Sequence, residues 1–247
     1  MLLQNNRPIY YFCLMYYVTG LSMFQTNKRA VLVGGGPIAH IPELVKGLPV
    51  IAVDGGLDAC LRNSIKPDYF LGDMDSASKS AQEYAVLNKI PTQPIFEQET
   101  TDFEKALTHV DASGFVCFGF LDGRLDHSLA TLHVVQKYVQ KRPILLYGSE
   151  DVIITASSDI SLTLPLSERL SLWPLGLVRF KSSTGLLYPL KGMEMSTGSQ
   201  IGTSNLTSEK TVEIKISEEN DGTYLIILSN IYFKELFMLS AAPAIPK

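Results

Sequence analysis

The most constraining feature of this chain is the stretch Lys66–Ser76, where a short apolar run ends in a glycine and two acids. Asp73 and Asp75 follow directly after Tyr69–Leu71 and Gly72. On an extended backbone, residues i and i+2 point to the same side, so we expect both carboxylates to face one cation. Mg²⁺ is commonly held by one or two carboxylates together with substrate phosphates. The stretch therefore predicts half of a metal–phosphate site.

Apolar segments typical of strands alternate with helical segments as far as residue 148. The expected strands are 29–33, 49–53, 69–71, 115–118 and 143–147, and the expected helices are 38–46, 57–63, 77–88, 101–109 and 126–139. This alternation favours a mostly parallel sheet that helices cover on both faces. We therefore predict an α/β fold whose N-terminal part, residues 23–148, is a Rossmann-like domain that binds nucleotide and metal.

The pattern changes near Gly148–Asp151. Six short expected strands follow, at 152–155, 161–164, 170–174, 178–181, 211–216 and 224–228, with turn residues and no convincing helix between them. Such a series is typical of an antiparallel sandwich or barrel. We predict a second domain, an antiparallel β-sandwich, over residues 149–247.

Residues 1–22 differ in composition from the rest of the chain. The segment Pro8–Asn27 carries no formal charge, but its tyrosines and polar residues dilute it as a membrane span. Signal peptides carry a small-x-small cleavage site, and none is clear here. The composition favours a native start at Met23, with 1–22 a non-native or disordered extension, over a signal or anchor or an ordered extension.

Charge and cysteine content exclude several classes of protein. The net charge is −4, and no run of Lys or Arg forms a basic stripe, so we expect neither nucleic acid nor membrane as a partner. The three cysteines are scattered and odd in number, which indicates neither a disulfide framework nor a zinc site. We expect buried thiols and a cytoplasmic location.

Two glycine loops follow the first two expected strands. Gly34–Ala39 matches G-x-G-x-x-A, and Asp54 lies 20 residues beyond Gly34, as in a dinucleotide-binding fingerprint. Phosphate-binding or merely tight turns are the alternatives that we favour. Asp54-Gly55-Gly56 opens a second such loop, which either presents its amides to a nucleotide or forms an ordinary turn with a capping acid.

Two later segments supply the rest of a metal–phosphate site. Asp102 and Lys105 share one face of a helical turn that Thr100 or Thr101 can cap. Asp102 could complete a site of three carboxylates, and Lys105 could bind phosphate; an ordinary surface ion pair is the alternative. We interpret Glu104 as a solvated helix acid. The segment Gly119–His127 adds Arg124, whose planar fork suits phosphate oxygens, and the acid Asp126.

In this order, the motifs resemble the thiamine pyrophosphokinase family. The matching segments are Asp54–Gly56, Gly72–Ser76, Thr101–Ala106 and Gly123–His127, followed in the second part by Ser171–Leu175, Thr184–Leu190 and Gly202–Asn205. The resemblance covers roughly residues 30–228. Several positions depart from the family pattern, namely Asp58, Asp122, Tyr188 and Leu206, and they affect details of substrate contact more than the reaction.

The resemblance implies Mg²⁺-dependent transfer of diphosphate from ATP to the hydroxyl of thiamine, with release of AMP. It implies Mg²⁺ ligands at Asp73, Asp75 and Asp102, and catalytic roles for these three with Lys105, Arg124 and Asp126. Nucleotide contacts are expected from Asp54, Gly55, Gly56, Thr101, Lys105, Arg124 and His127, and thiamine contacts from Tyr188, Ser204 and Asn205. Either Asp126 or a carboxylate such as Asp102 would take the alcohol proton. The resemblance also implies a homodimer.

Two other functions remain open at this point. A metal-dependent glycosyltransferase could use Asp73 and Asp75 on a nucleotide sugar, but Thr101–Ala106 and Gly123–His127 would then have no evident role. A non-catalytic protein that binds thiamine or nucleotide is the second alternative, and the complete set of acids argues against it.

Overall fold

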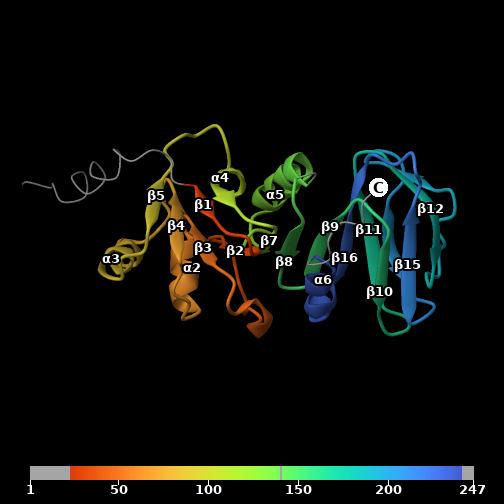
Figure 1. Cartoon of the computed structure of the whole chain (residues 1–247), viewed down its shortest axis with the longest axis horizontal. Helices are drawn as coiled ribbons and strands as arrows, with labels where there is room; N and C mark the ends of the chain where they lie inside the picture. Colours follow the sequence, from red (N-terminus) through yellow and green to blue (C-terminus); the bar gives the residue numbers. More distant parts are fainter. Residues whose placement is uncertain (1–22, 140, 241–247) are drawn as a thin grey trace, which may run out of the picture.

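A ten-stranded mixed sheet extends through both parts of the molecule (Figure 1). The computed structural model describes residues 23–139 and 141–240, so the predictions made for 1–22 lie outside the described residues. None of the helices in the described part is both long and apolar enough to cross a membrane.

Six strands in the order β5-β4-β3-β2-β7-β8 form the parallel part of this sheet. Their bounds are β2 Ala30–Val33, β3 Val50–Val53, β4 Tyr69–Gly72, β5 Thr92–Pro94, β7 Phe115–Phe118 and β8 Ile144–Tyr147. The chain runs outward from β2 to β5 and then returns to continue from β7 on the other side. This reversal creates a switch point between β2 and β7, where open α/β sheets bind ligands at the carboxyl ends of their strands.

Helices cover both faces of the parallel part (Figure 1). They are α2 Gly56–Arg62, α3 Lys79–Leu87, α4 Asp102–His109 and α5 Leu125–Tyr138. Alternate residues of β2 enter two different cores: Val31 and Val33 belong with α2 and α3, whereas Ala30 and Leu32 belong with α4 and α5. Burial on both faces explains why these strands are continuously apolar.

The sheet continues through four antiparallel strands. From β8 outward these are β9 Asp151–Ala156, β16 Thr223–Ser229, β11 Arg169–Leu175 and β14 Gly202–Leu206. A second antiparallel sheet contains β10 Ile160–Thr163, β15 Thr211–Ile216, β12 Val178–Thr184 and β13 Glu194–Met195. Small elements complete the chain: the pair β1 Phe24–Gln25 and β6 Val110–Asp111, the 3-10 turns η1 Glu43–Val45 and η2 Asn230–Tyr232, and α6 Phe233–Leu239.

The predicted combination of an α/β part and an antiparallel part is confirmed, but the two parts share one sheet. The strand direction changes between Tyr147 and Asp151, and β8 pairs directly with β9. One apolar core also extends from α2 and α3 into the second sheet. The Rossmann-like layout and the division at residues 148 and 149 stay predictions.

Two expectations about helices were wrong. Residues 38–46 contain only the short turn η1, because Pro42 would lack a hydrogen-bond donor inside a helix and would clash with the preceding turn. Without a helix after Gly34–Gly36, the dinucleotide-binding fingerprint lacks its anion-binding element. The helix α6 was missed; it packs its buried residues Phe233, Leu236 and Phe237 under the sheet.

Gly56 is required by the close packing of α2 against β2. A Cβ atom at Gly56 would lie 1.7 Å from the carbonyl oxygen of Val33, whereas one at Gly55 would find its nearest atoms at 3.5 Å. We predict that Gly56→Ala lowers the free energy of unfolding by at least about 2 kcal/mol. The matched variant Gly55→Ala should cost less than about 1 kcal/mol. Urea unfolding measures both, and equal costs would contradict the packing argument.

Candidate active site

A cleft of about 1100 Å³ opens at the carboxyl ends of the parallel strands. The loops after β2, β3, β4 and β7 line it, together with the first turns of α4 and α5. Most of the residues predicted for metal, nucleotide and catalysis line this cleft: Asp54, Gly55, Asp73, Asp75, Thr101, Asp102, Lys105, Arg124, Asp126 and His127. Gly56 is buried and does not line the cleft. The switch-point geometry thus brings four separate sequence segments to one place.

Three carboxylates that line the cleft lie close together. Asp54, Asp73 and Asp75 each offer an oxygen, and these oxygens all lie within 4.8 Å of one another. Asp73 and Asp75 do not lie on an extended strand as expected, because β4 ends at Gly72 and Met74 adopts a φ of +70°. Instead, Asp73 Oδ1 accepts a hydrogen bond of 3.3 Å from the Asp75 amide. A turn therefore brings the two acids together.

Asp54 is an unusual carboxylate. It is only 4% exposed, its φ is +47°, and its Oδ1 is a buried oxygen with no hydrogen-bond partner in the described part of the chain. Burial raises the pKa of Asp54 above its ordinary value. Ser76 and the Gly55 amide donate hydrogen bonds to this carboxylate and lower its pKa in part, but the buried oxygen without a partner is costly unless a cation compensates it. This orphaned oxygen, in a set of hard oxygen donors, fits the Mg²⁺ that the sequence predicts.

Lys105 neutralises part of this negative charge. Its ammonium lies 3.1 Å from Asp102 Oδ1 and 3.6 Å from Asp73 Oδ2, and the residue is 2% exposed. Burial alone would lower the pKa of Lys105, but the hydrogen bond with Asp102 and the neighbouring carboxylates raise it above its ordinary value. Lys105 is therefore a charged group inside the cleft. Asp102, a predicted metal ligand, lies outside the group of three carboxylates and beside this ammonium.

Helix α4 begins as predicted, with a threonine cap. Thr101 Oγ1 accepts a hydrogen bond of 3.2 Å from the Glu104 amide. The interpretation of Glu104 as a solvated acid was wrong: it is 6% exposed, and Oε1 accepts hydrogen bonds from Lys137 and Tyr138 of α5. Although burial would raise the pKa of Glu104, these hydrogen bonds hold it below its ordinary value. Glu104 thus fastens to α5 the helical turn that carries Lys105.

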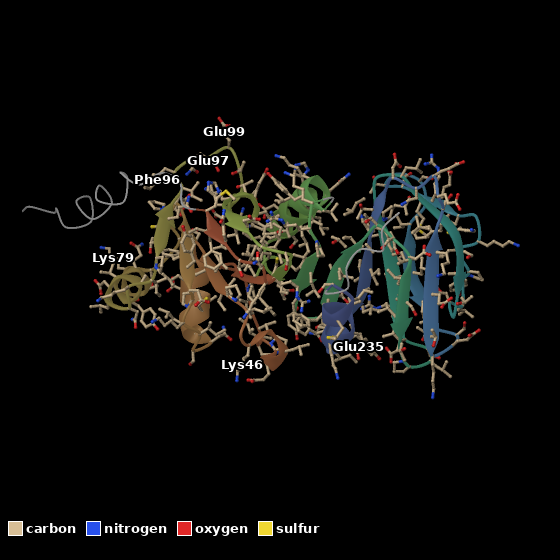
Figure 2. All side chains as sticks on the ribbon, in the orientation of Figure 1. Lys46, Lys79, Phe96, Glu97, Glu99 and Glu235 are labelled. Atoms are coloured by element: carbon tan, nitrogen blue, oxygen red, sulfur yellow. The ribbon has the colours of Figure 1, made fainter. Side chains whose placement is uncertain are left out.

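The loop between β5 and α4 approaches the acids from outside. Figure 2 labels Phe96, Glu97 and Glu99 on this loop. Glu97 accepts hydrogen bonds from the amides of Glu99 and Thr100, at 2.8 and 3.0 Å, which closes the loop on itself. Gln98 donates a hydrogen bond of 3.2 Å to Asp73. The prediction missed Gln98, whose only signal was its place just before the helix cap.

Arg124 and Asp126 face each other at the rim. Arg124 donates two hydrogen bonds to the Asp126 carboxylate, at 3.1 and 2.5 Å, and both side chains are mostly exposed. The hydrogen bond from Arg124 holds the pKa of Asp126 below its ordinary value, which makes this carboxylate a weaker base. His127 lies in the first turn of α5 beside them, and its amide donates a hydrogen bond to Asp126.

Two departures from the family pattern have structural roles. Asp58 accepts hydrogen bonds from the amide and hydroxyl of Ser78, the capping residue of α3. Asp122 accepts from the amide and hydroxyl of Ser149, at 2.8 and 2.9 Å. This second contact ties the loop after β7 to the turn between β8 and β9.

The predicted thiamine residues lie elsewhere. Tyr188, Ser204 and Asn205 belong to the antiparallel part, and none of them lines the acidic cleft. Tyr188 is 62% exposed and Ser204 is also exposed, whereas Asn205 is 6% exposed. Within one chain, the predicted thiamine residues therefore lie apart from the residues that line the acidic cleft.

Two family models match the chain. They are "Thiamin pyrophosphokinase, catalytic domain" over residues 45–146 and "Thiamin pyrophosphokinase, vitamin B1 binding domain" over residues 158–220. The first covers most of the parallel part with its cleft, and the second covers much of the antiparallel part with Tyr188, Ser204 and Asn205.

Curated proteins and solved structures agree with these models. Thiamine pyrophosphokinase 1 of Arabidopsis thaliana is 32% identical over 188 residues, which are 68% of this chain and 67% of the relative. Thiamine pyrophosphokinase 3 of Oryza sativa subsp. japonica is 28% identical and covers 68% of each chain. The crystal structure of thiamine pyrophosphokinase from Bacillus subtilis superposes with a TM-score of 0.68 at 23% identity, over 82% of this chain and 99% of that one. That structural match supports the fold.

The burial of Asp54 generates a prediction about pH. Because the pKa of Asp54 is raised in the folded state, its charged form opposes folding at neutral pH. We predict that Asp54→Asn is more stable than the unaltered chain at pH 7 without metal. The difference should shrink as the pH falls through the raised pKa and vanish below the ordinary value of 3.8.

Urea unfolding from pH 7 to pH 3.5, with and without Mg²⁺, tests this prediction. Mg²⁺ should stabilise the unaltered chain, since a ligand that binds only the folded state raises its stability. The Asn variant should gain less. A stability difference that does not depend on pH would contradict the assignment of Asp54 as an uncompensated charge.

Proposed function

The chain belongs to the thiamine pyrophosphokinase family, and we propose that it transfers the terminal diphosphate of ATP to the hydroxyl of thiamine, giving thiamine diphosphate and AMP. The observation that carries this proposal is the cleft at the switch point, where carboxylates surround the buried ammonium of Lys105. Phosphoryl-type transfer needs this kind of site, because its catalysis consists mostly of positioning and charge neutralisation.

Neither alternative function is favoured. A glycosyltransferase would leave the Thr101–Ala106 segment without a role, yet Asp102 and Lys105 of this segment line the cleft beside Asp73. A non-catalytic binding protein would not need several carboxylates concentrated around an ammonium. Both family models and the relatives described above are thiamine pyrophosphokinases.

We assign the Mg²⁺ to the carboxylates of the cleft. The sequence predicts Asp73, Asp75 and Asp102 as ligands. The geometry adds Asp54, which belongs to one group of oxygens with Asp73 and Asp75, whereas Asp102 lies outside this group. When bound, the ion would neutralise charge on the triphosphate. Hard oxygen donors match its preference.

The remaining residues of the cleft bind and orient the nucleotide in this proposal. Lys105 supplies a buried positive charge for the transferred group, held in place by Asp102. Arg124 offers its planar fork to phosphate oxygens at the rim. Amides of the Asp54–Gly56 loop, with Thr101 and His127, complete the nucleotide contacts. The alcohol proton passes either to Asp126 or to a carboxylate such as Asp102.

Thiamine, in this proposal, contacts Tyr188 and Ser204. The exposed ring of Tyr188 can stack on an aromatic cation. Because these residues do not line the acidic cleft of their own chain, a second copy of the chain would have to supply them, which agrees with the predicted homodimer. The unpaired thiols of Cys60 and Cys117 are compatible with the cytoplasm, which stays our proposed location.

The reaction has a direct test. Purified protein incubated with ATP, Mg²⁺ and thiamine should release thiamine diphosphate and AMP in equal amounts. We predict that Asp73→Asn lowers turnover by at least about 100-fold without loss of fold. The control Asp221→Asn alters a carboxylate whose side chain is 89% exposed and should leave turnover unchanged. Thiamine monophosphate with ADP would refute diphosphate transfer, and an unaffected Asp73 variant would refute the metal assignment.

The homodimer also has a test. If each site combines the cleft of one chain with Tyr188 of another, Asp73→Asn and Tyr188→Ala chains should complement each other when their subunits exchange. At limiting thiamine we predict recovery to about a quarter of the turnover of the unaltered protein, because half of the dimers are mixed and each has one intact site. A mixture no more active than the mean of its two components would contradict the shared site, as would a monomer in sedimentation.

A further inference from the structure

Asn205 differs in its surroundings from the other two predicted thiamine residues. It lies on the edge strand β14 and is buried, while its amide makes three hydrogen bonds to backbone. Asn205 Oδ1 accepts from the amides of Tyr188 and Leu206, at 3.1 and 2.9 Å, and Nδ2 donates to the carbonyl of Tyr188 at 2.8 Å. An asparagine side chain can make about four such bonds, so most of its capacity is used within the chain.

These bonds hold both polar backbone groups of Tyr188. The neighbouring residues are anchored as well: Leu187 donates its amide to Leu206 at 2.8 Å, and Leu190 donates its amide to Ser183 Oγ at 2.9 Å. Leu186 and Leu190 are buried on either side, whereas the Tyr188 ring is 62% exposed. The backbone of the loop is thus held by hydrogen bonds and buried neighbours, while the ring of Tyr188 is exposed.

Ser204 is directed outward by the same strand. The pairing of β11 with β14 shifts register between Leu170 and Leu172, and Ser204 adopts a φ of +59°. Its amide donates to the buried Ser171 Oγ at 3.0 Å. Irregularities of this kind redirect a side chain. Ser204 and Tyr188 are therefore exposed residues whose backbones are held by buried side chains, those of Ser171 and Asn205.

We infer that Asn205 is a positioning residue for thiamine binding, which acts by fixing the backbone of Tyr188 so that its ring is presented to the substrate. This inference rests on the proposed function, since it takes thiamine as the ligand of Tyr188. A preorganised ring binds with a smaller loss of conformational freedom. Loss of Asn205 should weaken thiamine binding and leave the nucleotide site unchanged.

A double-mutant cycle on the full-length chain tests this inference. Asn205→Ala should raise the KM for thiamine roughly threefold to tenfold, with the KM for ATP and kcat little changed. Asn205→Asp keeps the acceptor for both amides and loses the donor, so it should fall between the Ala variant and the unaltered chain. In a Tyr188→Ala background, Asn205→Ala should produce no further rise in the KM for thiamine, because the group it positions is absent.

Asn220 provides a matched control. It is a second buried asparagine of the antiparallel part, and it holds a different turn by accepting from the Arg179 amide at 2.9 Å and donating to Gly222 at 2.8 Å. Asn220→Ala should lower the melting temperature about as much as Asn205→Ala and leave the KM for thiamine unchanged. Equal increases of KM in both variants would indicate general destabilisation and overturn the inference.

Other outcomes distinguish a failure of the positioning role of Asn205 from a failure of the proposed enzyme function. Additive effects of the Asn205 and Tyr188 substitutions would mean that Asn205 contacts thiamine directly, and would overturn the positioning role while the enzyme function stands. An unchanged KM in Tyr188→Ala would overturn it in the same way. Absence of any thiamine diphosphate from the unaltered chain would overturn the proposed function, and this inference with it.

Discussion

The site depends on one constraint, which is the concentration of negative charge at the carboxyl ends of the parallel strands. Parallel strands end at a common edge, and here the loops after β3 and β4 each deliver acids to it. Lys105 from α4 lies among them and offsets part of the repulsion. The ion pair between the buried Glu104 and the half-exposed Lys137 of α5 in turn holds the helical turn that carries Lys105. Packing on one face of the sheet therefore supports the electrostatics at its edge.

Local patterns in the sequence predicted most of the residues that meet at the carboxyl ends of the parallel strands. The acids follow short apolar strands, and a strand followed by a helix places its carboxyl end beside those of its parallel neighbours. Asp102 and Lys105 could be assigned to one helical face from their spacing alone. The short turn at 43–45 was also within reach, since Pro42 stood in the middle of the expected helix.

Features that depend on distant partners could not be predicted. Glu104 was taken for a solvated acid because its partners Lys137 and Tyr138 lie more than 30 residues away on another helix. Asp54 was assigned to the nucleotide, and its approach to Asp73 and Asp75 depends on the packing of two loops. A motif also does not distinguish a residue that touches a ligand from one that supports the contact, as Asn205 illustrates.

The pairing of β8 with β9 limits how the molecule can move. Three residue pairs, Leu145 with Ile154, Leu146 with Ile153 and Tyr147 with Val152, join the parallel and antiparallel parts into one sheet. Bending between these parts would break this ladder and open a shared apolar core. Domain closure about a hinge, the usual way in which two-part enzymes exclude water from their substrates, is therefore costly here. We therefore expect water to be excluded by elements outside the sheet, such as the loop that joins β5 to α4 or the second copy of the chain in the proposed homodimer.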